Sequence, residues 1–246
     1  MSQADVALCT YNDDATLERA ISSVLNQDCL GVLYIVNDGS DDKTSYILNK
    51  YRNVEKVVVI TNDTNLGLAS SLNIIIRRSK ATYLARIDAD DMMLPLRLKK
   101  QIQYLDKHPN IIVLGSNSLV IRDGLKKYTN VPLNHFDVMS KLNWHNCIQH
   151  PTVMFRREVI KKIGGYAYKL RRCQDYELWI RLVKLGYHIA NHEECMTIIH
   201  VRTNRSINSI FKEFYVLIIL SIKYLKVTIF LQAIKSIFYN LISKLK

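Results

Sequence analysis

The stretch TYLARIDADD, residues 82–91, decides the fold. Its first six residues predict a buried strand, and three carboxylates follow within four positions, those of Asp88, Asp90 and Asp91. Carboxylates this close repel one another unless a cation lies among them. Mg²⁺ or Mn²⁺ held by one or two carboxylates keeps positions open for phosphate oxygens. The stretch therefore predicts a metal site at a strand end, and the alternative is an acidic cluster favoured by the dipole of the helix that Pro95 opens.

Around this stretch, short β-branched runs alternate with helical patterns. The helical patterns begin at Leu17, near Asp41 with Ser40 or Asp41 as N-cap, at Leu68 and at Pro95. Strands are predicted at Val6 to Leu8, Val32 to Val36, Lys56 to Ile60, Thr82 to Ile87 and Ile111 to Leu114. This alternation implies right-handed βαβ crossovers, an α/β class, and a mostly parallel open sheet with helices on both faces.

Polar turns follow the first strands, where ligands of such sheets bind. They are Thr10-Tyr11-Asn12, Asn37-Asp38-Gly39-Ser40 and residues 62–65. Asp38 can accept a hydrogen bond from a base or ribose, or it can serve the turn alone. Tyr11 can stack on a base or pack half-buried. Four polar turns, including the acidic one, thus converge on one crevice.

The second half of the chain is less regular. Residues 123–150 have weak periodicity and predict connecting structure near a substrate. Helical patterns return over Arg156 to Ile163, which ends at Gly164-Gly165, and over Asp175 to Leu185. Asp175 stands at the front of the last helix, as an N-cap or as a general base.

Composition narrows the class of protein. The chain has 246 residues, 48% of them apolar, with only 8 Gly and 4 Pro. These values fit one α/β domain with an appendage and exclude disordered and fibrous proteins. Five cysteines without a CxxC pair predict free thiols in a cytosolic setting, with no disulfide frame and no zinc site. We expect no signal peptide, because no basic segment precedes an apolar one at the N-terminus.

The net charge of +12 is concentrated in the C-terminal part. Residues 206–246 contain six lysines and one acidic residue, Glu213, among apolar stretches too short to span a membrane. Lys212, Lys223, Lys226 and Lys244 share one arc of a helix, whereas Lys235 points elsewhere. This pattern predicts two amphipathic helices with a bend between them, lying on an anionic membrane surface. The alternative is packing on the chain's own domain or on a second copy in a homodimer. We therefore divide the chain into a domain over 1–205 and a membrane-associating segment over 206–246.

A second basic cluster lies between the two last helical patterns of the domain. It predicts a solvated face, or a surface that adjoins the same lipid or a substrate bearing a pyrophosphate. Its members are Arg156, Arg157, Lys161, Lys162, Lys169, Arg171 and Arg172.

Seven blocks occur in an order that resembles family 2 glycosyltransferases over residues 4–205. They are Thr10-Tyr11-Asn12, Val36 to Ser40, Asn65 to Ala69, Ala85 to Asp91, His150 to Arg156, Gly164-Gly165-Tyr166 and Asp175 to Trp179. The resemblance implies a GT-A fold, a nucleotide-sugar donor, Mn²⁺ or Mg²⁺, and single displacement with inversion at the anomeric carbon.

The resemblance also implies residue roles. Asp90 and Asp88 would bind the metal, and Asp175 would be the catalytic base. The nucleotide would contact Thr10, Tyr11, Asn12, Asp38, Arg86 and Asp88. The donor or acceptor sugar would lie near Asp91, His150, Gly165, Tyr166, Trp179 and Arg181.

Three positions depart from the family pattern. Asn37 replaces an Asp, and Gln174 replaces the Glu that usually precedes the base, so that a neutral hydrogen bond would position the base. A motif ending in His, which can reach the metal or diphosphate, is replaced by Val201-Arg202-Thr203-Asn204, so Asn204 or His200 would substitute.

We therefore expect an inverting hexosyltransferase that moves one sugar from a nucleotide sugar to a lipid-linked acceptor. The donor is expected to be UDP-glucose, UDP-galactose or an N-acetyl form. The acceptor is expected to be an undecaprenyl-diphosphate saccharide at the inner face of the cytoplasmic membrane, in O-antigen, lipopolysaccharide or capsule synthesis. The alternatives are a basic nucleic-acid-binding protein, a nucleotidyltransferase, which would need a Gly-rich loop after the first strand, and a non-catalytic homologue.

Overall fold

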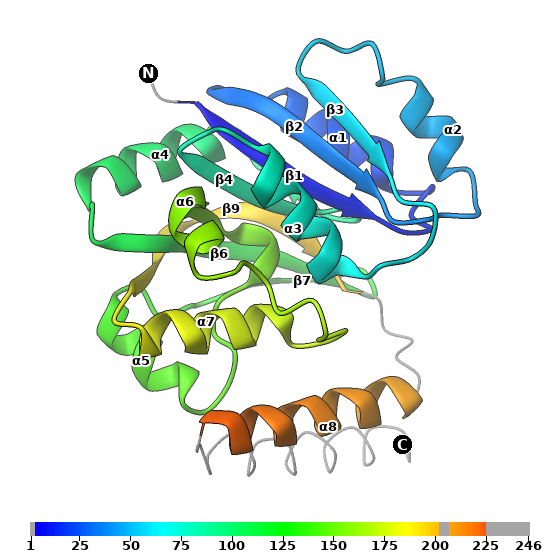
Figure 1. Cartoon of the computed structure of the whole chain (residues 1–246). Coiled ribbons are helices and arrows are strands. Elements are labelled where there is room, and N and C mark those ends of the chain that lie inside the picture. The colour runs from blue at the N-terminus through cyan, green and yellow to red at the C-terminus, as the bar shows by residue number, and fades with distance from the viewer. Residues whose placement is uncertain (1–2, 202–206, 225–246) are drawn as a thin grey trace.

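The computed structural model describes residues 3–201 and 207–224. Strands and helices alternate through the first half of the chain, and the region from residue 111 to residue 200 contains both long strands and helices (Figure 1). The elements, in chain order, are β1 (Ala4–Thr10), α1 (Leu17–Leu25), β2 (Leu30–Asn37), α2 (Thr44–Asn49), β3 (Val57–Thr61), α3 (Leu68–Arg78), β4 (Tyr83–Asp88), β5 (Met92–Met93), α4 (Arg97–Lys107), β6 (Ile111–Arg122), β7 (Leu125–Tyr128), α5 (His135–Leu142), the short 3₁₀ helix η1 (His150–Thr152), β8 (Met154–Arg156), α6 (Arg157–Lys162), α7 (Gln174–Lys184), β9 (His188–His200) and α8 (Ile207–Tyr224).

The strands form one nine-stranded sheet with the order β3-β2-β1-β4-β8-β6-β9-β5, and β7 pairs with β6. The pairs β1–β2, β1–β4 and β2–β3 are parallel, as the alternating sequence predicts. The carboxyl ends of these four strands therefore meet at one edge, and they carry the polar turns identified above.

The other half of the sheet is mixed. β8 lies between β4 and β6 and runs antiparallel to both, whereas β9 runs parallel to β6. The predicted, mostly parallel sheet is thus limited to the first four strands. The reversal of β8 has a consequence for the site, because it brings the residues just before β8 to the carboxyl end of β4.

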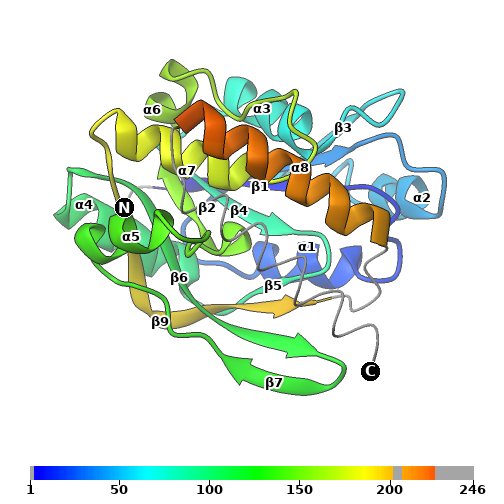
Figure 2. The same cartoon turned by 90° about the horizontal axis from the view of Figure 1, so that it is seen from below.

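Each face of the sheet carries its own hydrophobic core. Alternate residues of β1 point to opposite faces, with Val6 and Leu8 in the core beneath α1, α2 and α4, and Ala7 in the core with α3, α6 and α7. Viewed from below, α3, α6 and α7 lie on one side of the sheet and α1 on the other (Figure 2). All five cysteines are free, as their spacing predicts.

Helix α8 lies across α7 at the bottom of the molecule (Figure 1). Its inner face buries Leu217, Leu220 and Tyr224 in the same core as Trp179. The inner face of α8 therefore follows the alternative in which the tail packs on its own domain. Residues 225–246 of the predicted membrane segment lie outside the described residues. None of the helices in residues 3–201 and 207–224 has the length and hydropathy needed to cross a bilayer.

Candidate active site

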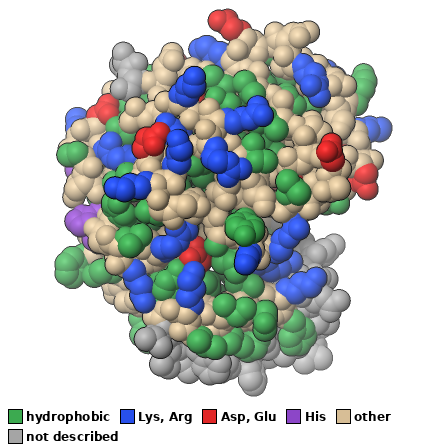
Figure 3. Space-filling model, in the orientation of Figure 1, with side chains coloured by type: hydrophobic (Ala, Val, Ile, Leu, Met, Phe, Trp, Pro, Cys, Tyr) green, Lys and Arg blue, Asp and Glu red, His purple; other side chains and the backbone are tan. Residues whose placement is uncertain are grey.

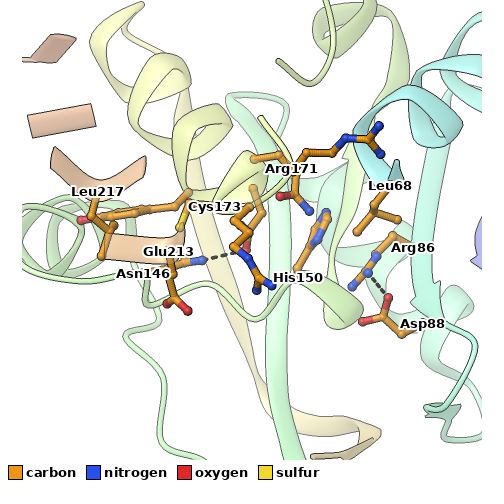
Figure 4. A pocket seen from close by; sticks show the side chains of 13 residues that line it. Leu68, Arg86, Asp88, Asn146, His150, Arg171, Cys173, Glu213 and Leu217 are labelled. Atoms are coloured by element: carbon orange, nitrogen blue, oxygen red, sulfur yellow. Dashed lines mark hydrogen bonds and ion pairs between the residues drawn. The ribbon is translucent and has the colours of Figure 1, made fainter. Parts of the chain in front are cut away.

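A cavity of about 430 Å³, here called the inner pocket, lies where β4, α7 and α8 approach one another. Arg86 and Asp88 come from β4, Asn146 and His150 from the segment before β8, and Asp175 from the first turn of α7. Figure 4 shows Arg86 and Asp88 on one side of the pocket, Asn146 on the other, and His150 between them. Residues predicted from three separate motifs are thus brought to one cavity.

Asp88, Asp90 and Asp91 form an acidic cluster at the end of β4, and their carboxylate oxygens lie within 4.8 Å of one another. Burial, reinforced by the charge of Asp88, raises the pKa of Asp91 to about 8. The backbone N–H of His200 donates a 2.8 Å hydrogen bond to Asp91. Closely spaced carboxylate oxygens of this kind are the donor set that Mg²⁺ and Mn²⁺ prefer, so the residues present fit such an ion.

Arg86 is buried beside this cluster with only 2% of its surface exposed. Its Nη2 pairs with Asp88, whereas its Nε and Nη1 have no hydrogen-bond partner among the described residues. Buried donors are normally satisfied in folded proteins. The unpartnered donors of a residue that lines the inner pocket indicate a place for a carbonyl or anionic oxygen of a ligand.

Asp175 is the second residue of α7, and the N-cap position belongs to Cys173, so the capping alternative for Asp175 is wrong. Asn146 donates a 2.7 Å hydrogen bond from Nδ2 to Oδ2 of Asp175. Burial raises the pKa of Asp175, and hydrogen bonds from the Tyr176 backbone and from Asn146 lower it in part. A carboxylate with a raised pKa is a better proton acceptor than a fully solvated one.

The neutral hydrogen bond expected to position Asp175 therefore exists, but it comes from Asn146 and not from Gln174. The Oε1 of Gln174 is buried without a hydrogen-bond partner in the described part of the chain. Asn146 was not predicted, because it lies 29 residues before Asp175 in a segment without periodicity.

His150 is buried in the pocket wall, and its Nε2 lies 2.8 Å from the hydroxyl of Tyr166. Burial, helped by the charge of Arg86, lowers the pKa of His150, so this imidazole is neutral at physiological pH. Tyr166 is fixed in turn by Asn73, whose amide bonds both the N–H and the carbonyl of Tyr166 at 2.8 Å. Tyr166 therefore positions His150 from behind.

The turns after β1 and β2 are tied to each other. The side chain of Asn12 donates to Asp41 at 2.7 Å and accepts from its backbone N–H at 3.1 Å. Thr10 is buried, whereas Tyr11 is 45% exposed and free to stack on a planar ligand. The nucleotide contacts of Thr10, Tyr11 and Asn12 stay predictions.

Asp38 is buried, and both of its carboxylate oxygens accept hydrogen bonds from within the chain. The donors are the side chains of Asn62 and Ser71 and the backbone N–H groups of Leu66 and Gly67, at 2.7 to 3.0 Å. These contacts hold the loop between β3 and α3. A contact between Asp38 and a base stays a prediction.

Three of the predicted sugar-binding residues, Trp179, Arg181 and Gly165, support the fold: the first two through their side chains and the third through its backbone conformation. The expectation that Trp179 contacts the acceptor is wrong, because this side chain has no exposed surface and lies in the core. Arg181 is not at the sugar either, since its guanidinium bonds Glu177 and the carbonyls of Ile163 and Gly165. Gly165 contributes a backbone conformation with φ of 69°, which allows close approach to Asn73.

Arg97 is a second residue that the sequence patterns did not reveal. Its side chain is fully buried and donates to the carbonyls of Arg86 and Pro151 and to the hydroxyl of Thr197, at 2.9 to 3.0 Å. It therefore ties β4, η1 and β9 together behind the acidic cluster. The Arg-x-x-x-Gln spacing to Gln101, which accepts from Arg97 at 3.1 Å, is the available sequence signal.

Of the two candidates for the role of the missing family histidine, His200 and Asn204, the structure describes only His200. His200 ends β9 beside the acidic cluster, and its Nδ1 lies 3.4 Å from a guanidinium nitrogen of Arg19. Asn204 lies outside the described residues.

A parallel half-sheet with an acidic cluster at one strand end, and a carboxylate across the pocket, is an arrangement that a transferase acting on a nucleotide sugar can use. Comparison with known proteins agrees. Residues 5–164 match glycosyl transferase family 2, and the chain belongs to that family. It is therefore a glycosyltransferase.

Relatives are found among bacterial glycosyltransferases. The amylovoran biosynthesis glycosyltransferase AmsE of Erwinia amylovora is 30% identical over 192 residues, which cover 76% of this chain and 71% of AmsE. The O-antigen biosynthesis glycosyltransferase WbnJ of Escherichia coli is 29% identical over 202 residues, covering 80% of this chain and 78% of WbnJ.

Solved structures confirm the GT-A fold. The structure of S. aureus TarS 1–349 in complex with UDP-GlcNAc superposes with a TM-score of 0.70 at 19% identity. The match covers 89% of this chain and 66% of that one. The TarS structure with UDP gives a TM-score of 0.67 and is matched over 64% of its length.

Proposed function

We propose that the protein transfers one sugar, with inversion, from a UDP-sugar to a hydroxyl of a lipid-linked saccharide in the synthesis of a bacterial surface polysaccharide. One observation carries this proposal. Asp175, a carboxylate with a raised pKa, and Asp88, a member of the acidic cluster, line the same cavity of about 430 Å³.

Asp175 has the properties of the base that such a reaction needs. The acceptor hydroxyl must lose its proton as it attacks the anomeric carbon, and a single carboxylate suffices for this step. Oδ2 of Asp175 accepts from Asn146, and the carboxylate is the group that takes the proton. The hydrogen bond fixes the carboxylate plane toward the pocket.

The leaving group requires charge compensation on the opposite side. Asp88 and Asp90 would hold Mg²⁺ or Mn²⁺, which would supply positive charge for the departing diphosphate. The free donors of Arg86 lie at the same end and can hold an oxygen of the nucleotide. His150, which is neutral, can orient a sugar hydroxyl without adding charge.

A uridine nucleotide is proposed as the donor carrier because TarS structures contain UDP and UDP-GlcNAc. Tyr11, exposed beside the turn after β2, is suited to stack on the base. Glucose, galactose and their N-acetyl forms remain the proposed sugars.

A lipid-linked acceptor at the membrane surface is supported by two findings. AmsE and WbnJ are named for amylovoran and O-antigen biosynthesis. In addition, the outer face of α8 exposes Ile219 and Ile222 by 37% and 70%, next to lysine side chains. Figure 3 shows hydrophobic side chains along α8 and basic side chains between α8 and the main body. We propose peripheral association with the inner face of the cell membrane.

The catalytic assignment is tested with Asp175→Asn and Asp90→Ala, and with Asp28→Asn at an exposed site as the control. UDP release from UDP-glucose, UDP-galactose and their N-acetyl forms is measured with a bacterial lipid-linked saccharide fraction, and UDP binding by calorimetry with Mn²⁺. We expect Asp175→Asn to lower turnover by about 10² to 10⁴ while UDP binding is kept. Asp90→Ala should remove the Mn²⁺-dependent part of UDP binding. Near wild-type turnover in Asp175→Asn would refute the base assignment, whereas absence of turnover in the wild type with every donor would leave the non-catalytic alternative.

The membrane assignment is tested without removing α8, because its inner face belongs to the core. Ile219→Ser and Ile222→Ser are combined, and the matched control combines Leu125→Ser with Tyr128→Ser, which are 78% and 70% exposed on β7. Sedimentation with phosphatidylglycerol vesicles should decrease only for the α8 variant. Equal sedimentation of both variants would contradict an interface at α8.

A further inference from the structure

A second cavity, of about 400 Å³ and here called the outer pocket, lies between α8 and the loop that joins α6 to α7. Its apolar lining includes Phe211 and Tyr215 of α8. Its basic lining consists of Lys169, Arg171, Arg172 and Lys212. No residue among its lining is acidic, so four cationic groups surround an apolar hollow.

The charges of the outer pocket are largely uncompensated. Within residues 3–201 and 207–224, no ion pair or hydrogen bond of the side chains of Lys169, Arg172 or Lys212 is found. Arg171 donates only to oxygens of Asn65, at 3.1 and 3.4 Å, and so keeps its charge. Four cations in a pocket whose own lining has no carboxylate attract a multivalent anion, although Glu213 lines the neighbouring inner pocket.

The outer pocket adjoins the inner pocket. Arg171 and Arg172 line both cavities, and the inner pocket contains Asp175. An anionic group held by these arginines can therefore carry an attached saccharide toward the base. The inner side of this junction is closed by Glu213 and Leu217 of α8.

An apolar path leads away from the outer pocket in the other direction. Phe211, Tyr215, Ile219 and Ile222 are 52%, 65%, 37% and 70% exposed, and they follow one another at helical spacing along the outer face of α8. Apolar groups exposed in a row indicate a surface that contacts lipid.

We infer that the outer pocket binds the diphosphate of the lipid-linked acceptor. The lipid chain would lie along the outer face of α8 and the saccharide in the inner pocket. The inference rests on the proposed function, and it goes further by naming which residues recognise the acceptor. Charge complementarity favours a diphosphate, because a diphosphate placed here has four cationic neighbours and an apolar floor for the first carbons of its chain.

The test uses the full chain saturated with UDP and Mn²⁺, so that the donor site is filled. Farnesyl diphosphate, inorganic pyrophosphate and farnesol serve as probes, and binding is followed by calorimetry below the critical micelle concentration. We expect farnesyl diphosphate to bind at least about tenfold more tightly than either of the other probes, which corresponds to about 1.4 kcal/mol.

The variant for this test combines Lys169→Ala with Lys212→Ala, because these lysines line the outer pocket and not the inner one. This variant should lower the affinity for farnesyl diphosphate by about tenfold or more and leave the affinity for UDP unchanged. The matched control, Lys126→Ala with Lys127→Ala, removes two exposed charges from β7 and should change neither affinity.

Three results would overturn the inference. If pyrophosphate displaces UDP and the lysine variant lowers the affinity for UDP, the basic residues of the outer pocket belong to the donor site. If phosphatidylglycerol vesicles bind through Lys169 and Lys212 while farnesyl diphosphate does not, the surface recognises bilayer headgroups. If UDP binds but no probe does, the acceptor site is elsewhere, whereas failure of UDP itself to bind would refute the proposed function.

Discussion

Asn146 and Asp175 are joined by a 2.7 Å hydrogen bond across the inner pocket, although 29 residues separate them in the sequence. The amide donates to Oδ2 and so restrains the orientation of the carboxylate. It also stabilises the ionised carboxylate and so lowers the pKa that burial raises. This bond therefore sets both the orientation and the acidity of the proposed base.

Asn146→Ala is expected to reduce turnover by about tenfold, because a carboxylate that loses a hydrogen bond is less well oriented and more basic. The pKa of Asp175 rises when the lowering contribution of Asn146 is removed. Since the base acts when ionised, the acid limb of the pH–rate profile should move to higher pH. The profile of UDP release checks this, with Asn53→Ala, at an exposed turn, as the control. An unshifted acid limb would show that Asn146 does not act through Asp175.

Asp38→Ala should destabilise the protein by about 3 kcal/mol, because several buried donors lose a charged acceptor at once. UDP affinity is expected to fall as well, since the loop between β3 and α3 borders the nucleotide end of the sheet. Denaturant unfolding and calorimetry provide the two measurements. Asp63→Ala, an exposed carboxylate in the same loop, is the matched control and should leave both values unchanged. Loss of UDP affinity without loss of stability would instead indicate direct contact between Asp38 and the nucleotide.

Glu177 links α7 to α8, and its carboxylate is buried. Burial alone would raise its pKa, but hydrogen bonds from Arg181, Tyr224 and Lys223 lower it below the ordinary value. A depressed pKa in the folded state stabilises the protein above the pKa of the unfolded chain. This stabilisation is therefore lost as the pH falls from about 4.3 through the lower folded-state pKa.

Hydrogen exchange of α8 at pH 7 and at decreasing acidic pH measures this effect. Protection of α8, expressed relative to the intrinsic exchange rate at each pH, should decrease at low pH in the wild type, while Glu177→Gln should show low protection already at pH 7. Glu158→Gln, whose carboxylate is 67% exposed, is the control. Equal protection of α8 in all three proteins would contradict an anchoring role for Glu177.

Gly165→Ala should cost more stability than Gly164→Ala. Both glycines have positive φ, of 69° and 92°, and the left-handed conformation alone costs an alanine about 1–2 kcal/mol. At Gly165 a Cβ would also stand 2.3 Å from Oδ1 of Asn73, whereas nothing lies within 4 Å at Gly164. The clash would displace Asn73 and loosen Tyr166, so UDP release should fall only in the Gly165 variant. Equal effects of the two substitutions in thermal unfolding would contradict this.

The first half of the fold follows closely from periodicity. The apolar spacing that begins at Leu17 predicts α1, which the structure confirms, and the four parallel strands lie within two residues of their predicted positions. The predicted start of α2 near Asp41 is wrong. Ser40 and Asp41 are engaged by Asn12, so they cannot cap, and the helix begins at Thr44.

The second half could not be predicted in the same way. β9 is interrupted by register shifts opposite Ser116 and Asn117, and its polar residues break the alternation that marks a strand. β8 has only three residues, too few for a periodic signal. Local patterns also cannot separate a tryptophan that faces a ligand from one in the core, which is why Trp179 was misplaced.

Lys223 illustrates the same limit on the tail. The helical arc of lysines places it toward lipid, whereas its Nζ pairs with Glu177 at 2.9 Å while half of the side chain stays exposed. A tertiary partner on α7 decides its direction, and the sequence of α8 does not contain that partner.

Substitutions on the two faces of α8 should have different effects in the cell. Changes at Leu217, Leu220 or Tyr224 disturb the packing against α7, the helix that carries Asp175, and should behave as loss-of-activity alleles. Changes at Ile219 or Ile222 leave that packing intact and should behave as mislocalisation alleles that retain activity in extracts. Neighbouring positions of one helix would thus give two phenotypes. Raising the concentration of the enzyme should rescue the mislocalisation alleles and not the loss-of-activity alleles.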